Sequence, residues 1–184
     1  MTLGPGLRKL TLTAHVTTSV GWLGAVVAFL GLAVAGLTNP EAQTVRGASL
    51  GMEMTARFAI VPLSVASLAT GMVQSLTTTW GLFRHYWVVA KLLINVFANI
   101  VLLMYMPTLR SLGTVAAQAS VSSRGLQLLR DPSPVLHSSA ALVLLLVATA
   151  LSVYKPRALT RYGWRKQREQ RAVLVPQPLR TDRP

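Results

Sequence analysis

The sequence predicts an all-α protein: a polytopic four-helix transmembrane bundle with both termini in the cytoplasm. Two observations carry this prediction: the 184-residue chain has four long apolar segments, and all but one of its 18 Lys and Arg residues lie outside them. A helix needs about 20 apolar residues to cross a bilayer. The expected spans are residues 11–37, 58–76, 86–106 and 135–154. We therefore expect a bundle in residues 1–158 and a basic tail in residues 159–184.

Composition narrows the functional classes. The formal net charge of +13 would indicate nucleic acid in a soluble protein, but half of the basic residues follow Tyr154, beyond the last apolar segment. Membrane topology explains this distribution, so we expect no nucleic-acid partner. The chain has no cysteine, which excludes disulfides and thiolate chemistry. It also lacks the HExxH, GxSxG and Walker A patterns, so no catalytic residue can be assigned.

The first span carries two helix faces. Small residues at steps of three and four predict a seam for close helix contact; these are Gly21, Gly24, Ala28, Gly31 and Ala35. A second face groups His15, Thr18, Ser19 and Trp22, so we expect the imidazole to point into the bundle. The alternative of a cleaved secretory signal is disfavoured, because the apolar run exceeds the roughly 7 to 15 residues of a signal core.

The second helix is expected to begin at Asn39-Pro40-Glu41, which offers a capping side chain, a proline and an acidic residue in the first turn. Residues 41–57 mix charged and apolar side chains and are expected at the outer surface. Pro62 is expected to bend the span that follows. A polar seam toward the first span is predicted at Ser64, Ser67, Gly71 and Gln74.

The third span contains Lys91, Asn95 and Asn99, four residues apart on one helix face. An ammonium group inside a span is costly unless it is paired or reaches the interface, so these residues are functional candidates. Snorkelling of Lys91 to the interface is the structural alternative. Pro107 is expected to end this span, and residues 108–130 to form a surface loop with a partial helix.

The distribution of arginine and lysine sets the orientation. Cytoplasmic flanks are enriched in these residues, and an even number of spans puts both termini on one side. Cytoplasmic termini leave Arg8, Lys9, Arg84 and the basic tail inside. We expect this tail, residues 159–184, to lack regular structure and to contact anionic lipid headgroups of the bilayer.

A haem site is the first cofactor hypothesis. The rise of about 1.5 Å per helical residue places His15 and Lys91 in one layer near the cytoplasmic side. His15 would then ligate the iron of b-type haem, Lys91 would pair with a propionate, and Trp22 would pack on the ring. Asn95 continues this polar face. Such a site would serve a redox or electron-transfer role with a membrane partner; the alternative is a histidine that only joins helices.

Copper is the second cofactor hypothesis. Thioether and imidazole ligands suit Cu(I). Candidates expected near the outer face are Met52, Met54, Met104, Met106 and His137. Methionines at helix ends more often serve in packing. A third interpretation is a non-catalytic structural component of the membrane.

The spacing of His15, Trp22 and Gly24, followed by His85 and Lys91-Leu92, resembles that of bacterial four-span integral membrane proteins of unknown function. The likeness includes GLFRHYWVVAKLL and DPSPVLHSS. More distantly, the first and third spans resemble HemJ-type haem-binding membrane protoporphyrinogen oxidases and CopD-like copper-resistance proteins. The HemJ resemblance implies functional roles for His15 and Lys91. Phe29 and Leu30 occupy the region where that family has an arginine. The resemblance implies a location in the bacterial plasma membrane.

Overall fold

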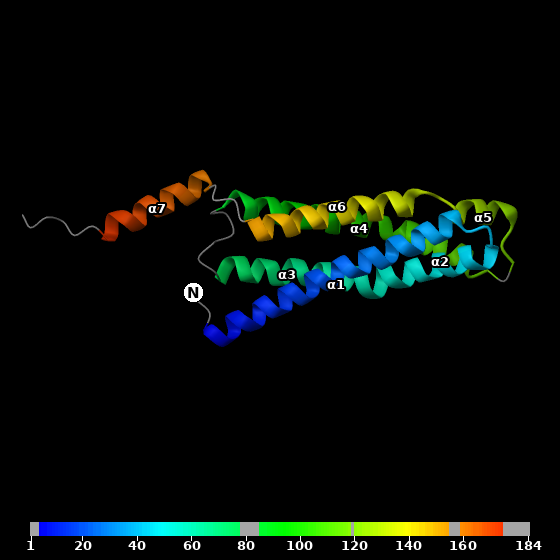
Figure 1. Ribbon diagram of the computed structural model, residues 1–184, viewed down its shortest axis with the longest axis horizontal. Helices are drawn as coiled ribbons and strands as arrows, with labels where there is room; N and C mark the ends of the chain where they lie inside the picture. Colours follow the sequence, from blue (N-terminus) through cyan, green and yellow to red (C-terminus); the bar gives the residue numbers. More distant parts are fainter. Residues whose placement is uncertain (1–3, 78–84, 119, 155–158, 175–184) are drawn as a thin grey trace, which may run out of the picture.

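The structure, a computed structural model, describes residues 4–77, 85–118, 120–154 and 159–174. These residues form an all-α bundle (Figure 1). The elements in chain order are α1 (Pro5–Thr38), α2 (Ala42–Thr55), the π-helical turn η1 (Ala56–Ile60), α3 (Val61–Thr77), α4 (Tyr86–Ala116), α5 (Ser123–Leu129), α6 (Ser133–Tyr154) and α7 (Arg161–Leu174).

Four helical segments of the described chain are long and apolar enough to cross a membrane. They are Pro5–Thr38, Ala42–Leu76, Tyr86–Ala116 and Ser123–Tyr154. The prediction of a four-helix bundle is thus confirmed, and the protein is a multi-pass membrane protein. At a rise of about 1.5 Å per residue, the 34-residue α1 is about 50 Å long, so it extends beyond a hydrocarbon core of about 30 Å.

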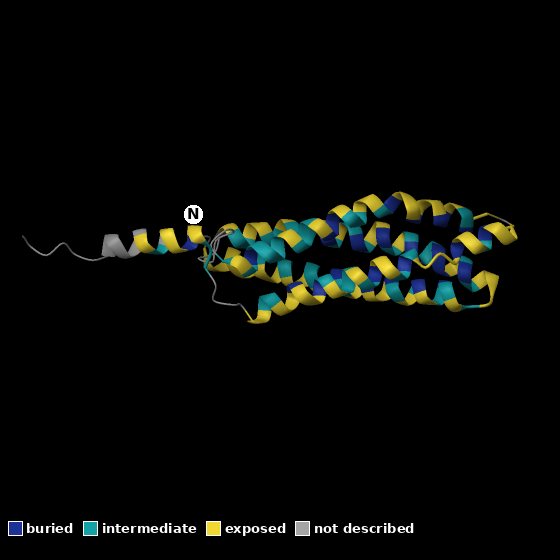
Figure 2. Cartoon of the chain, turned by 90° about the horizontal axis from the view of Figure 1, so that it is seen from above, coloured by how far each residue is buried: buried dark blue, intermediate teal, exposed yellow. Residues whose placement is uncertain are grey.

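Helix α1 packs against α2, α3 and α6, and α4 packs against the same three helices. The core between them contains Trp22, Val26 and Phe29 of α1, together with Met52, Ile60, Met106, Leu109 and Leu145 of the other helices. In Figure 2, buried positions lie mainly where helices face one another, while exposed positions cover the outside of the bundle.

The predicted small-residue seam of α1 is wrong for most of its length. Gly24, Ala28 and Gly31 are exposed, and a Cβ atom added at Gly24 or Gly31 would meet no atom within 4 Å. The buried face is instead Trp22, Val26, Phe29, Ala33 and Gly36. This face repeats at the same spacing but has larger side chains, so it buries more surface against α2, α3 and α6.

The second helix begins slightly later than predicted. Helix α2 starts at Ala42, because the Asn39 side chain accepts a hydrogen bond from the Glu41 amide at 2.9 Å in the turn that precedes it. Where a bend is expected at Pro62, the structure has the π-helical turn η1, after which the Val61 amide donates to Ala56 O. Proline has no amide hydrogen and crowds the preceding turn, and the wider π turn accommodates it.

The prediction that Pro107 ends the third span is also wrong. Helix α4 continues to Ala116. Residues 123–129 form α5, which confirms the partial helix expected in this segment. A proline within a helix costs about 3 kcal/mol. Beyond Pro107, Leu109 and Leu112 are buried against neighbouring helices, and burial contributes about 1.5–3 kcal/mol for each such side chain, which offsets the cost.

The basic tail contains a helix, α7, where the sequence predicted no regular structure. It lies at the end of the bundle where α1 begins (Figure 1). Five basic side chains occur in its sequence, at positions 161, 165, 166, 168 and 171. Arg84, used in the prediction of orientation, lies outside the described residues, as do residues 175–184.

Two arginines bind helix ends at the opposite end of the bundle. Arg46 Nε donates to Ala116 O at 3.0 Å, at the end of α4. Arg130 Nη2 donates to Asn39 O and Pro40 O, each at 3.0 Å, just after α1. Carbonyl groups at a helix C-terminus lack partners within the helix and carry partial negative charge, so both guanidinium groups are well placed.

We expect Arg130→Ala to lower the free energy of unfolding by about 1 kcal/mol, because it removes two charge-assisted hydrogen bonds from an exposed position. The melting temperature in detergent, followed by circular dichroism, measures the effect. The control is Arg110→Ala, which removes an exposed arginine whose side chain makes no hydrogen bond within the described residues. Equal melting temperatures for the two variants would show that Arg130 does not hold this end of the bundle.

Candidate functional site

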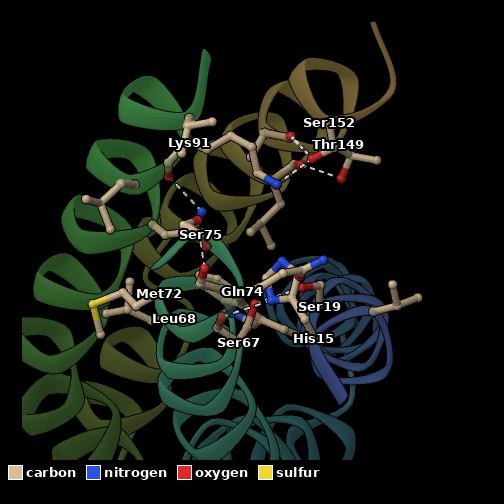
Figure 3. A pocket seen from close by; sticks show the side chains of 18 of the residues that line it. His15, Ser19, Ser67, Leu68, Met72, Gln74, Ser75, Lys91, Thr149 and Ser152 are labelled. Carbon is tan, nitrogen blue, oxygen red and sulfur yellow. Dashed lines mark hydrogen bonds between the residues drawn. The ribbon is translucent and has the colours of Figure 1, made fainter. Parts of the chain in front are cut away.

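A cavity of about 550 Å³ lies between α1, α3, α4 and α6, at the end of the bundle where α1 begins. Cofactor and ligand sites in proteins are typically about 300–1,000 Å³ in volume. Polar side chains from all four helices line it (Figure 3); these are Arg8, His15, Ser19, Ser67, Gln74, Ser75, Lys91, Asn95, Thr149 and Ser152. The remaining wall is largely apolar and includes Trp22, Trp87, Leu23 and Leu145.

His15 is held in one orientation by α3. Its Nδ1 lies 3.2 Å from Ser67 O and 3.2 Å from Thr70 Oγ1. A backbone carbonyl can only accept a hydrogen bond, so Nδ1 carries the proton in the neutral ring and Nε2 keeps a lone pair. Nε2 has no hydrogen-bond partner within the described residues. A histidine fixed in this way is suited to act as a metal ligand, because metal-bound histidines usually donate their other N–H to a carbonyl or carboxylate.

Polar contacts beside His15 join α1 to α3. The hydroxyl groups of Ser19 and Ser67 lie 2.8 Å apart, and those of Thr18 and Thr70 lie 3.5 Å apart. Gly71 allows this approach, since an added Cβ atom would lie 2.9 Å from Cε1 of the His15 ring. These contacts confirm the predicted polar seam of the second span at Ser67 and Gly71.

Lys91 lies across the cavity from His15, on α4 (Figure 3). Its ammonium group donates a hydrogen bond to Ser152 Oγ of α6, and Ser152 in turn donates to Ala148 O at 2.9 Å. The structure therefore brings His15 and Lys91 to one cavity, as predicted. Lys91 is bound by the neighbouring helix there, which differs from a lysine that reaches solvent along its own helix.

The two asparagines of the predicted face, Asn95 and Asn99, have different surroundings in the structure. Asn95 lines the cavity, and its Nδ2 donates to Lys91 O at 2.8 Å. Asn99 is buried one turn further along, donates to Asn95 O at 2.9 Å and is not among the cavity-lining residues. The polar stripe therefore enters the cavity only as far as Asn95.

The charge of the cavity wall is positive. Arg8 and Lys91 line it together with the ionisable His15, whereas no Asp or Glu of the described residues does. In a low-dielectric region, such a wall attracts a ligand with negative groups. The cavity can therefore hold a partly apolar molecule that carries anionic substituents.

Several sequence candidates lie elsewhere. Met52 and Met106 are buried in the core, but Met54 and Met104 are 57% and 76% exposed, because residues two apart point to different sides of a helix. The structure does not gather these methionines with His137 into one site. Within the described residues, no group of three or more His, Asp or Glu side chains could hold a metal ion. His85 precedes α4 and does not line the cavity.

Sequence reasoning missed the contribution of α6. Thr149 and Ser152 line the cavity beside Lys91, yet they are three residues apart in a strongly apolar span. Their spacing places them on one helix face and was an available signal. Nothing local indicated that this face would meet Lys91.

We expect Gly71→Ala to destabilise the protein by about 1–3 kcal/mol, because the new methyl group overlaps the His15 ring, whose position Ser67 O fixes. The control is Gly24→Ala, where a Cβ atom meets nothing and the helix gains about 0.5–1 kcal/mol from the substitution. Melting temperatures in detergent should change in opposite directions. An unchanged melting temperature in Gly71→Ala would mean that the His15 ring is not fixed against α3.

Comparison with protein-family models, with curated proteins and with solved structures finds no match to this chain. The resemblance to four-span membrane proteins therefore stays a prediction, and the roles of His15, Trp22, Lys91 and Asn95 must be inferred from the chemistry of the cavity that they line.

Proposed function

We propose that the protein binds b-type haem in this cavity and serves as a redox or electron-transfer component of the membrane. The proposal rests on the orientation of the His15 ring and on which of its nitrogen atoms carries the proton. Its Nδ1–H is bound to Ser67 O, which leaves the Nε2 lone pair for an iron ligand. His15 is the only histidine of the described residues that lines the cavity, so the chain offers one axial ligand.

The other lining residues fit the haem group. A volume of about 550 Å³ lies within the range of cofactor sites, and the apolar wall suits a flat macrocycle. Trp22, which is 2% exposed, is available to pack on the ring. Lys91 and Arg8 can pair with the two propionates, and the described wall has no carboxylate that would repel them.

The residues of this chain would hold and tune the cofactor. Haem, when bound, supplies a one-electron redox couple. Ser67 O would orient His15 and raise the basicity of its Nε2 atom. Lys91, positioned by Ser152, would counter the negative charge of a propionate. The apolar wall would keep water away from the site, which influences the redox potential.

We also propose that the protein resides in a bacterial plasma membrane with both termini in the cytoplasm. Arg8 and Lys9, near the start of α1, and the basic helix α7 lie at the same end of the bundle, and lysine and arginine favour the cytoplasmic side. The cavity would then lie in the cytoplasmic half of the membrane. The basic residues of α7 would interact with anionic lipid headgroups.

We expect protein purified in detergent from haem-supplemented cells to show a Soret band that His15→Ala abolishes, because the iron loses its protein ligand. The control is His85→Ala, which removes a histidine outside the cavity lining and should retain the band. Lys91→Leu should weaken haem retention more than Lys91→Arg, which keeps the positive charge. A colourless wild-type protein, or a band unchanged in His15→Ala, would contradict the proposal.

Topology reporters test the orientation. Alkaline phosphatase fused after Thr38 or Val121 should be active, whereas green fluorescent protein should fluoresce when fused after Thr79 or at Pro184. The fusion at Val121 lies beyond Ala116, where α4 ends. An external C-terminus would overturn the proposed orientation.

A further inference from the structure

A second cavity, of about 240 Å³, lies further along the bundle between α1, η1, α4 and α6. Its wall is almost wholly apolar and includes Val26, Phe29, Ile60 and Leu102. Trp22 lines both cavities and is buried between them. The second cavity is therefore a distinct site that adjoins the polar one.

This cavity reaches the outside of the bundle between α4 and α6. Phe97 of α4 lines it and is 57% exposed, and His137 and Ala140 of α6 both line it and are exposed. In a membrane-spanning bundle, the outer faces of these helices meet hydrocarbon chains. A ligand that reaches the cavity by this route must be soluble in lipid.

His137 provides a polar group at the opening. Its Nδ1 donates to Ser133 O at 2.8 Å, so Nε2 is the acceptor of the neutral ring. Nε2 has no hydrogen-bond partner within the described residues, so its lone pair can accept a hydrogen bond from a ligand. A ligand hydroxyl group would satisfy it.

The shape of the wall indicates an aromatic ring. The His137 ring stacks on Tyr105, with centroids 4.1 Å apart and planes inclined by 15°. Trp22, Phe29 and Phe97 supply further aromatic walls. A volume of about 240 Å³ is below the usual range for drug-sized ligands, so it suits one substituted ring rather than a fused ring system.

We propose that this second cavity binds the headgroup of a lipid-soluble quinol, with a ring hydroxyl donating to His137 Nε2 and the isoprenoid tail leaving between α4 and α6. A quinol matches each feature: it is apolar, has a single planar ring, carries O–H donors and resides in the bilayer. The hydrogen bond at this site does not depend on haem, because His137 does not line the first cavity; Trp22 is the one described residue that lines both cavities.

The test compares two probes, a decyl-substituted benzoquinol and its dimethyl ether, which lacks the hydroxyl hydrogens. We expect the full-length protein in nanodiscs to bind the quinol about tenfold more tightly, because the ether cannot donate the hydrogen bond to His137. Isothermal titration calorimetry measures both dissociation constants under anaerobic conditions. Equal affinities of the wild-type protein for the two probes would overturn the proposal.

Variants separate hydrogen bonding from fit. His137→Leu keeps an apolar wall and should remove the difference between the probes; a difference that persists would arise from the size of the ether and would refute the role of His137. Ala141→Leu fills the cavity and should weaken binding of both probes, whereas Leu136→Ala, at a 65% exposed position outside the lining, should change neither. Unchanged quinol binding by Ala141→Leu would mean that the quinol binds elsewhere.

His15→Ala distinguishes this proposal from that of haem binding. The variant should lose the Soret band and still bind the quinol with wild-type affinity and the same preference over the ether. Quinol binding by a protein that never shows a Soret band would support the second site alone. Loss of quinol binding in His15→Ala would contradict the independence of the two sites.

Discussion

The polar contact between α1 and α3 orients the rest of the functional end of the bundle. His15 reaches Ser67 O and Thr70 Oγ1, and Ser19 meets Ser67, inside a segment that is otherwise apolar. Hydrogen bonds between membrane helices contribute only about 0.6 kcal/mol on average, so these contacts add little stability. Their importance is geometric: they fix the rotation of α1, direct Nε2 of His15 and keep the imidazole against Gly71.

Two cavities follow one another along the axis of the bundle, and they differ in chemistry. The first has cationic and hydroxyl groups, with Arg8, Lys91 and Ser152 on its wall, whereas the second is lined mostly by carbon. Trp22 lies between them, close to the middle of α1. A large indole at this position separates a polar compartment from an apolar one, and it would contact the proposed haem on one side and the proposed quinol on the other.

Away from the polar cavity, the helices are kept continuous and are joined by different means. The π turn before Pro62 and the continuation of α4 past Pro107 each accommodate a proline without ending a helix. Arg46 and Arg130 then bind the carbonyl groups at the ends of α4 and α1. These contacts replace the hydrogen bonds that helix ends lack, and they hold the connections at that end close to the core.

The sequence by itself determined the number of spans and the residues that share a helix face, because both follow from apolar length and from the helical period. On this basis His15 and Trp22, and separately Lys91 and Asn95, could be predicted to act together. Only the tertiary structure decided which face each helix buries. In the structure, Gly24 and Gly31 face outward, and each Met-x-Met pair has one methionine in the core and one at the surface. Helix α4 continues past Pro107, and Ser152 accepts a hydrogen bond from Lys91. Each of these outcomes depends on contacts between residues far apart in the chain, and local periodicity contains no information about them.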